Sequence, residues 1–302
     1  MTAIPDIPAA ATVLLLRENG RDGLQVLLTK RAAGLSFMAG LWVFPGGRME
    51  PADLAPALLD RVDPAAIAAT ATQMLDTAGE PVAPATARGL LIAACRETFE
   101  ESGVLLARNG DGSPGVDPGR LARLAARRAE TSREPALFAQ LLADEDLTLD
   151  LERLVYWAHW ITPSLEKKRF DTRFFALTVP PDQEASVDLG ELTHHAWLNQ
   201  QDIARHTASG EMRIAPPTRA TLEDLWHSHD RHGGLAGMLE AERGRSVPPI
   251  LPKMVDAGDA TEIVLPWDPQ YEQTEGAGCK VLAHYPAYIE SMPSRMRFAR
   301  VT

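Results

Sequence analysis

The sequence predicts an α+β fold in which a mixed β-sheet lies between layers of helices. Short β-prone runs alternate with helical patterns along the chain. This alternation has no regular strand–helix–strand period, which argues against a doubly wound parallel sheet. The chain has 302 residues, of which 45 % are apolar, so it is long enough to bury a substantial core.

The N-terminal strands are expected to form a hairpin. Residues 12–16 and 24–29 are apolar, β-prone runs, and the turn-prone residues 19–23 lie between them. Residues 42–44 form a third short strand, which ends at Pro45-Gly46-Gly47. Further strands are expected at 154–161, 173–179 and near 195–198.

Helices account for much of the remaining chain. Residues 51–80 are rich in Ala, Asp and Leu and predict one or two helices. In residues 85–102 apolar side chains recur at helical spacing, and Gly103 follows where a helix stop belongs. Other helices are expected at 121–130, 135–144, 218–227 and 235–242, and residues 263–265 form an isolated apolar run in the tail.

The charge and cysteine content exclude several classes of protein. A net charge of -11 is unfavourable for nucleic-acid binding, which usually needs a basic face. The two cysteines, Cys95 and Cys279, cannot build a disulfide framework or a zinc ribbon. There is no secretory signal pattern, and no run approaches the roughly 18 apolar residues of a membrane span. We therefore expect a cytoplasmic protein that binds neither membranes nor nucleic acid.

Three glutamates on the predicted helix 85–102 are the main candidates for chemistry. Glu97, Glu100 and Glu101 are spaced so that they share one helix face, where they repel one another. A bound divalent cation would remove that repulsion, and Mg²⁺ prefers oxygen ligands. A solvated acidic face is the simpler alternative for three glutamates alone. Arg96 favours the metal site because it could hold the first glutamate by a charge-assisted hydrogen bond.

The segment Arg96-Glu97-x-x-Glu100-Glu101-x-Gly103, followed by Val104, resembles the second half of the sequence box of the Nudix hydrolase superfamily. Gly47, five further residues and Asp53 resemble the first half, with Asp where the family has Glu. A short loop joins the halves in most members. Here an insertion at about residues 54–86 interrupts the box.

The resemblance implies a Nudix fold, with the mixed sheet between helices. Residues 1–230 would form the Nudix domain, and residues 231–302 a C-terminal extension packed on it. The resemblance also implies Mg²⁺ as cofactor, with Mn²⁺ as an alternative. The implied metal ligands are Glu97, Glu100, Glu101 and Gly47, and the implied catalytic residues on the helix are Glu100 and Glu101.

A second motif narrows the expected substrate. Residues 27–32, then Gly40, then Phe44-Pro45-Gly46-Gly47 resemble the extra motif of coenzyme A diphosphatases. Ser36 stands where that motif has its second Arg. The interrupted box resembles the peroxisomal branch of these enzymes. Nevertheless, Phe-Pro-Gly-Gly loops are common to many Nudix proteins, so the motif does not exclude other diphosphate substrates.

Basic residues supply the expected anion contacts. Lys167 to Arg169 and Arg173 form a basic cluster in an otherwise acidic chain. Coenzyme A carries a 3'-phosphate as well as its diphosphate, and such a cluster could bind either. A solvated turn with paired charges is the alternative. The implied substrate-binding residues are Arg31, Phe44, Lys168, Arg169 and Arg173.

The general base is expected outside the box. Glu191 precedes the strand near 195–198, where Nudix proteins commonly place such a residue, and Glu166 is the rival. His194 and His195 would point to opposite faces of a strand, so one of them could reach the cleft. An exposed structural role is the alternative for each of these four.

The leading functional hypothesis is hydrolysis of coenzyme A or acyl-coenzyme A to adenosine 3',5'-bisphosphate and (acyl-)phosphopantetheine. The alternatives are a pyrophosphohydrolase of another nucleoside diphosphate derivative, such as ADP-ribose, a nucleotide sugar or a nucleoside triphosphate, and a non-catalytic nucleotide-sensing module. The expected partner is a small molecule. Related hydrolases are frequently dimers, so a homodimer is left open.

Overall fold

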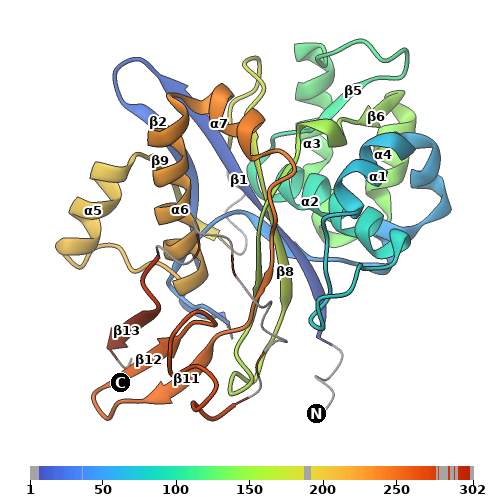
Figure 1. Ribbon diagram of the computed structural model, residues 1–302. Helices are drawn as coiled ribbons and strands as arrows, with labels where there is room; N and C mark the ends of the chain where they lie inside the picture. The colour runs from blue at the N-terminus through green and yellow to red at the C-terminus, as the bar shows by residue number, and fades with distance from the viewer. Residues whose placement is uncertain are drawn as a thin grey trace.

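The computed structural model describes residues 7–35, 37–186, 192–276, 278, 285, 289 and 292–299. Within them a large mixed sheet forms the centre of the molecule (Figure 1). The strand order is β10-β7-β8-β1-β2-β3, with β4 also paired to β1 and β9 to β2. The strands are β1 (Ala9–Asn19), β2 (Gly23–Arg31), β3 (Trp42–Val43), β4 (Gly46–Arg48), β7 (Val155–Ile161), β8 (Asp171–Thr178), β9 (Leu192–Leu198) and β10 (Pro249–Ile250).

Strand β1 is the axis of this sheet. It runs parallel to β8 along one edge, and its other edge pairs antiparallel with β4 at its start and with β2 at its end. The hairpin of β1 and β2 is confirmed, with Asn19 opposite Gly23. Alternate residues of β1 enter different hydrophobic clusters: Val13 and Leu15 enter the first, Leu14 and Leu16 the second. The sheet is therefore covered on both faces, as expected.

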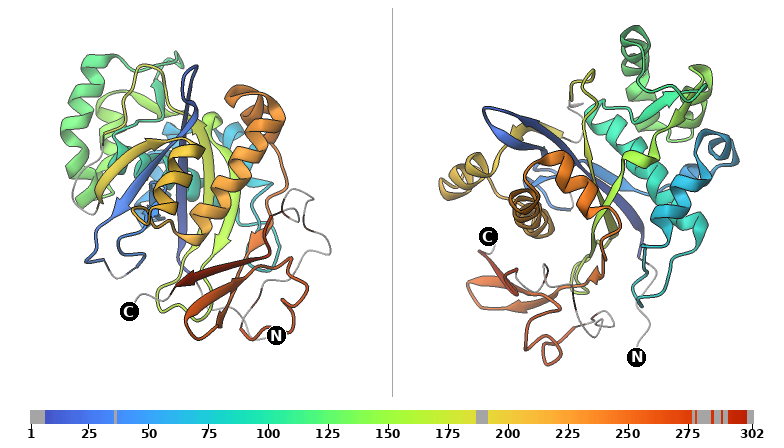
Figure 2. Two further views of the ribbon diagram at one scale, coloured as in Figure 1. Left: turned by 90° about the vertical axis from the view of Figure 1, so that its left-hand side faces the viewer. Right: turned by 45° about the horizontal axis from the view of Figure 1, so that its top comes forward.

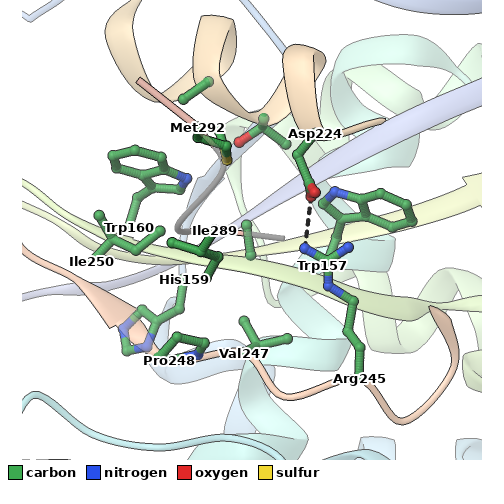
Figure 3. A pocket seen from close by; sticks show the side chains of 13 residues that line it. Trp157, His159, Trp160, Asp224, Arg245, Val247, Pro248, Ile250, Ile289 and Met292 are labelled. Atoms are coloured by element: carbon green, nitrogen blue, oxygen red, sulfur yellow. Dashed lines mark hydrogen bonds and ion pairs between the residues drawn. The ribbon is translucent and has the colours of Figure 1, made fainter. Parts of the chain in front are cut away.

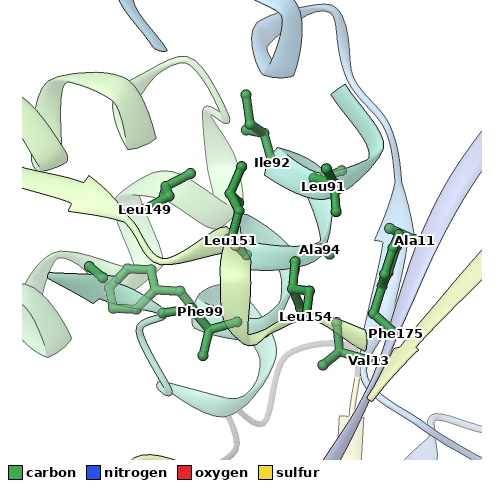
Figure 4. Close-up of a cluster of buried hydrophobic side chains, with 14 of the residues drawn as sticks. Ala11, Val13, Leu91, Ile92, Ala94, Phe99, Leu149, Leu151, Leu154 and Phe175 are labelled. Carbon is green, nitrogen blue, oxygen red and sulfur yellow. The ribbon is translucent and has the colours of Figure 1, made fainter. Parts of the chain in front are cut away.

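Helices cover each face (Figure 2). The first hydrophobic cluster lies under α2 (Pro84–Ser102) and the elements around it, as the close-up in Figure 4 shows. The other helices on this side are α1 (Pro64–Ala71), α3 (Pro118–Arg133) and α4 (Leu137–Asp144). The second cluster lies on the opposite face, under α6 and α7. The helices there are α5 (Gln200–Ala208), α6 (Pro216–His232) and α7 (Leu235–Glu242).

The long helix α2 begins and ends where its sequence indicates. Pro84 occupies the first turn, where its missing N–H costs no hydrogen bond. Gly103 has a φ of 72°, and its N–H donates to the Phe99 carbonyl at 2.9 Å. Most of the helix is buried, including Cys95, which is the core residue that its position indicates. The three candidate glutamates therefore lie on a long helix that is mostly buried.

The insertion is less helical than expected. Two short 3₁₀ helices, η1 (Pro51–Leu54) and η2 (Pro56–Arg61), precede the single α-helix α1. A turn follows, in which Leu75 and Pro81 form an isolated β-bridge. Leu58, Val62, Ala66 and Met74 enter the first hydrophobic cluster. The insertion is thus part of the core, and its prolines favour 3₁₀ turns over a continuous helix.

The chain beyond residue 230 contributes to the main sheet. Strand β10 lies parallel to β7, and the proposed division at residue 230 falls within α6. A separate antiparallel sheet is made of β11 (Lys253–Asp256), β12 (Ala260–Val264) and β13 (Arg295–Ala299). Sequence patterns indicated only the apolar run at β12. The small elements β5 (Ala107–Asn109), β6 (Leu147–Leu149) and η3 (Leu151–Arg153) complete the described fold.

Candidate active site

Two of the three glutamates of α2, Glu97 and Glu101, lie against strand β4. The N–H of Gly46 donates to Glu101 Oε2 at 2.8 Å. A Cβ added to Gly47 would lie 2.4 Å from the Glu97 carboxylate, so only glycine allows this close approach. Gly46 has a φ of 153°, and a Cβ there would meet the Ala11 carbonyl oxygen at 2.4 Å. The two glycines therefore place main chain directly beside the carboxylates.

Arg96 organises the acidic side chains around it. Its Nη1 donates to Glu97 Oε1 at 2.8 Å and to Glu100 Oε2 at 2.9 Å. Its Nε and Nη2 donate to the two oxygens of Asp53 at 2.8 and 3.0 Å, and Nη2 also reaches the Arg48 carbonyl. Asp53, which occupies the Glu position of the box, therefore holds Arg96 and faces the guanidinium. Sequence reasoning did not anticipate this role.

The cluster carries excess negative charge. One guanidinium faces the carboxyl groups of Asp53, Glu97 and Glu100, and all four groups are largely buried. Burial raises the pKa of Glu97 to about 7, although Arg96 partly offsets the shift. Burial likewise raises the pKa of Glu100, again against the influence of Arg96. Glu100 Oε1 is buried without a hydrogen-bond partner. A further positive charge is what this arrangement lacks.

The residues fit a hard divalent cation through their remaining oxygens. Carboxylate oxygens and a nearby backbone carbonyl are the ligands that Mg²⁺ prefers. Within the described ranges, however, no three His, Cys, Asp or Glu side chains already converge as a metal-ion site. Glu97 and Glu100 each accept a hydrogen bond from Arg96 with one oxygen, and Glu101 accepts one from the Gly46 amide. Metal binding would use the other oxygens.

Two segments predicted to bind substrate meet in the structure. The rings of Phe37 and Phe170 pack edge to face, with centroids 5.3 Å apart. Arg31 Nε donates to the Phe37 carbonyl at 3.2 Å, and Lys168 Nζ lies 5.6 Å from the Phe170 centroid. Arg169 is half-buried, and its Nε donates to the Thr162 carbonyl. The loop between β2 and β3, here called the motif loop, and the turn between β7 and β8 therefore form one surface. Sequence reasoning did not anticipate this contact.

Two expected substrate contacts are corrected. Phe44 is 3 % exposed and packs against Phe174, with centroids 6.2 Å apart, so its side chain belongs to the second hydrophobic cluster. Arg173 is 1 % exposed and is held by Asp171 and by the Leu75 carbonyl. Both side chains therefore belong to the protein interior.

The candidate bases that the structure describes are exposed. Glu191, like Ser36 of the motif loop, lies outside the described residues. Glu166 is exposed, and its N–H donates to the Pro163 carbonyl in a tight turn. His194 and His195 are both exposed on β9, opposite Lys30 and Thr29 of β2. The choice of base therefore stays a prediction.

A separate pocket lies on the opposite face of the sheet (Figure 3). The guanidinium of Arg245 lies 4.6 Å from the Trp157 ring centroid and pairs with Asp224 at 2.6 Å. Figure 3 also shows His159 on the other side of its strand from Trp160. None of the site residues predicted from the sequence lines this pocket. It is a packed junction between β7, α6 and the C-terminal extension.

The fold and the carboxylate helix define the class of Nudix hydrolases. The family model described as NUDT19 Nudix domain matches residues 8–225. The chain therefore belongs to the NUDT19 Nudix domain family. No helix in the described part of the chain has the length and apolar character that crossing a membrane requires.

Named relatives agree with this assignment. The human protein "Acyl-coenzyme A diphosphatase NUDT19" is 31 % identical over 223 residues, which cover 65 % of this chain and 59 % of the relative. The protein of the same name from Xenopus laevis is 27 % identical over 239 residues, covering 70 % of this chain and 62 % of the relative. The matches thus span less than two thirds of these relatives' own length.

A solved structure supports the fold. The NUDIX hydrolase from Alicyclobacillus acidocaldarius is 28 % identical and superposes with a TM-score of 0.59. The comparison covers 82 % of this chain and all of that structure, 100 %. The expected α+β Nudix fold is confirmed.

Proposed function

We propose that this protein hydrolyses the diphosphate of coenzyme A or acyl-coenzyme A in a Mg²⁺-dependent reaction. The products would be adenosine 3',5'-bisphosphate and (acyl-)phosphopantetheine. The observation that carries the proposal is the buried carboxylate cluster on α2, set against Gly46 and Gly47 at the end of a coenzyme A diphosphatase-like motif. The names of the human and frog relatives support the same substrate class.

The reaction needs a water molecule to attack one phosphorus atom of the diphosphate. A bond forms between the water oxygen and that phosphorus, and the bond from the phosphorus to the bridging oxygen breaks. The bridging oxygen leaves with the other phosphoryl group, and a proton from the water passes to a base. A bound divalent cation supplies positive charge at the phosphate oxygens and lowers the pKa of a bound water.

We assign the metal-holding role to Glu97, Glu100 and Glu101, together with the carbonyl of Gly47. Arg96 fixes the orientation of Glu97 and Glu100 from behind, through charge-assisted hydrogen bonds. Glu101 is fixed by the Gly46 amide. Because these side chains are held on a rigid helix, little reorganisation is needed when the substrate binds.

We propose Glu191 as the general base, with Glu166 as the alternative. Glu191 immediately precedes β9, which pairs with β2 as far as Arg31. Glu166 lies in the same turn as the basic residues. A Glu191→Gln variant that keeps full turnover would transfer the role to Glu166.

We propose that Arg31, Lys168 and Arg169 contact the phosphates of the adenosine half. The contact between Phe37 and Phe170 supports this, because it brings the three cations to one surface. Phosphate recognition by Arg and Lys relies on charge-assisted hydrogen bonds of the kind this surface offers. A 3'-phosphate distinguishes coenzyme A from ADP-ribose, so these residues would set the preference between them.

A substrate panel tests the proposed function. The purified full chain is incubated with coenzyme A, an acyl-coenzyme A, ADP-ribose, a dinucleoside polyphosphate or a nucleoside triphosphate, each with Mg²⁺ or Mn²⁺, and products are identified by mass spectrometry. We expect adenosine 3',5'-bisphosphate from the first two and no turnover with EDTA. Cleavage of another diphosphate without any release from coenzyme A would reject the substrate assignment.

A binding measurement separates metal from substrate. Mg²⁺ at a hundred times its dissociation constant should stabilise the folded protein by about 2.7 kcal/mol, because it binds the folded state alone. The expected signal is a rise in melting temperature that is absent in a Glu97→Gln/Glu100→Gln double variant. An equal rise in both proteins would place the cation elsewhere.

A further inference from the structure

A second buried charge cluster lies on β7 and β8, two strands from the glycines of β4. Arg173 Nη1 lies 2.5 Å from Asp171 Oδ1, and the same oxygen lies 2.5 Å from His159 Nε2. Arg173 and His159 are almost completely buried. Arg173 belongs to the basic cluster predicted from the sequence, but its burial removes it from contact with substrate.

The strand register places this cluster beside the carboxylate site. His159 lies opposite Arg173, Arg173 opposite Ala11, and Ala11 opposite Gly47. In-register neighbours point to the same face of a sheet, and Ala11 belongs to the hydrophobic cluster under α2. Two strand spacings put the Arg173 and Gly47 backbones roughly 10 Å apart.

Arg173 reaches from this row into the insertion. Its Nη2 donates to the Leu75 carbonyl at 2.6 Å. Leu75 lies in the insertion turn, defined here as residues 74–82. This turn is closed by the Val82 amide on the Met74 carbonyl at 3.0 Å, and the Asp76 amide donates to the Glu80 carbonyl at 2.7 Å. The buried guanidinium therefore provides a polar contact that ties the turn to the sheet.

The insertion is thus held by an arginine near each end. At its start, Asp53 is bound by Arg96 of the box helix. At the insertion turn, Leu75 is bound by Arg173 of β8. Strand β4, with Gly47, pairs with one edge of β1, and β8, with Arg173, pairs with the other. We infer that Arg173 is a positioning residue, which fixes the insertion turn as one wall of the substrate site.

The chemistry of the cluster favours a role in positioning the insertion turn over a role in stabilising the folded protein. Arg173 Nε and His159 Nδ1 are buried without hydrogen-bond partners, so the network pays for incomplete pairing. A buried ion pair of this kind often stabilises less than apolar residues would. The planar guanidinium can contact Asp171 through one nitrogen and the Leu75 carbonyl through another, whereas lysine has a single ammonium nitrogen.

Hydrogen–deuterium exchange tests the anchor without any activity. In Arg173→Met, peptides covering residues 74–82 should exchange on the order of tenfold faster, because a charge-assisted hydrogen bond to that segment is lost. Peptides covering α6 and β12 should be unchanged. Arg245→Met is the matched control, since Arg245 is also a buried ion-paired arginine but lies on the opposite face. Equal exchange of residues 74–82 in wild type and Arg173→Met overturns the inference.

Arg173→Lys guards against a variant that fails to fold. It keeps a positive charge beside Asp171 but loses the two-armed geometry. We expect a normal sheet exchange pattern with residues 74–82 still exchanging faster than in the wild type. Full protection of residues 74–82 in Arg173→Lys would show that charge alone holds the turn and would overturn the two-armed anchor.

Steady-state kinetics test the consequence for substrate, and this part rests on the coenzyme A activity proposed above. Arg173→Met should raise KM for coenzyme A about threefold or more while kcat changes less than about twofold, since binding and not chemistry is affected. A fall in kcat with unchanged KM would overturn the positioning role. If the wild type does not cleave coenzyme A, the proposed function fails, while the exchange result still decides the anchor.

Discussion

Two buried arginines, Arg96 beside β4 and Arg173 two strands away on β8, show how differently one residue type can be used. Arg96 on α2 faces three carboxyl groups, those of Asp53, Glu97 and Glu100. Arg173 on β8 faces one carboxylate, Asp171, together with His159. The first cluster has two more negative charges than positive ones when its carboxyl groups are ionised, whereas the second is balanced when its histidine is neutral.

This difference in charge distinguishes the Arg96 cluster, the candidate cation site, from the Arg173 cluster, which joins parts of the structure. Unbalanced carboxylates that are buried and pinned in place are costly without a further cation. A balanced pair has no such requirement, and its remaining donor is free to bind a backbone carbonyl, as Arg173 does with Leu75. Both arginines belong to charged sequence motifs, and the difference in their pairing is what supports the proposed metal site at the Arg96 cluster.

The largest expected effect comes from removing the Arg96 guanidinium, the one positive charge of the cluster in which carboxyl groups are in excess. Arg96→Met should lower the free energy of unfolding by about 3–5 kcal/mol, because three buried carboxyl groups lose their shared partner. Arg173→Met should cost less, since Asp171 keeps His159 as a neighbour. Urea denaturation of both variants measures the difference. Equal losses would mean that charge balance does not distinguish the clusters.

Glu100→Gln should separate activity from stability. We expect turnover to fall at least about a hundredfold, because a metal-binding carboxylate is lost. Stability without metal should not fall, since the change reduces the excess negative charge around Arg96. Glu130→Gln on α3 provides a control at an exposed helical glutamate. Near-normal turnover in both Glu100→Gln and Glu101→Gln would remove the metal-helix proposal.

Gly47→Ala tests the close approach of β4 to the glutamates. The new methyl group would displace the Glu97 carboxylate, which lies 2.4 Å from its position. We expect about a tenfold or greater loss of kcat/KM from the misplaced side chain, with a stability cost of about 1–3 kcal/mol. In Gly110→Ala a Cβ would likewise meet a carboxylate, that of Asp146 at 2.5 Å, but outside the box, so it is the matched steric control. Unchanged kinetics in Gly47→Ala would show that Glu97 position is unimportant.

The smallest expected effect is on the pH dependence of stability. Burial, and then the neighbouring Arg173, lower the pKa of His159 from 6.5 to about 4, although Asp171 and Asp76 oppose the shift. Between these values the unfolded chain binds a proton that the folded protein does not, so stability falls as the pH decreases from about 6.5 to about 4.

A His159→Gln comparison isolates this contribution. Glutamine can still donate to Asp171 but does not titrate. Its free energy of unfolding should depend less on pH in that window than that of the wild type, by at most about 1.4 kcal/mol per pH unit. Urea titrations at several pH values measure the slope. Parallel curves for the two proteins would show that His159 is not held neutral.

Elements with strong local signals were predictable from sequence. The β1–β2 hairpin and helix α2 have turn residues, helical spacing and a terminal glycine that act locally. Strand β13 of the C-terminal sheet carries no such pattern, because it pairs with β12 across about 30 or more residues of chain, as Val264 with Arg295 shows.

The site was only partly predictable for the same reason. Spacing placed Glu97, Glu100 and Glu101 on one face, because a helix fixes that geometry. Whether Arg173 points to solvent depends on which strands flank β8 and on the insertion, and these are long-range features. The partnership of Asp53 with Arg96 likewise joins distant residues, and the contact of Phe37 with Phe170 joins two loops.

The attachment of the insertion determines where its length can vary. The chain leaves the box at Asp53, which is bound to Arg96, and returns at Pro84, the first residue of the same helix. Because both ends are fastened to one rigid element, lengthening an exposed part of the chain between them is inexpensive: doubling a flexible loop costs only about 0.6 kcal/mol of loop entropy. The buried residues of the insertion are tied to the core, so only its exposed segments can change in length without moving the glutamates.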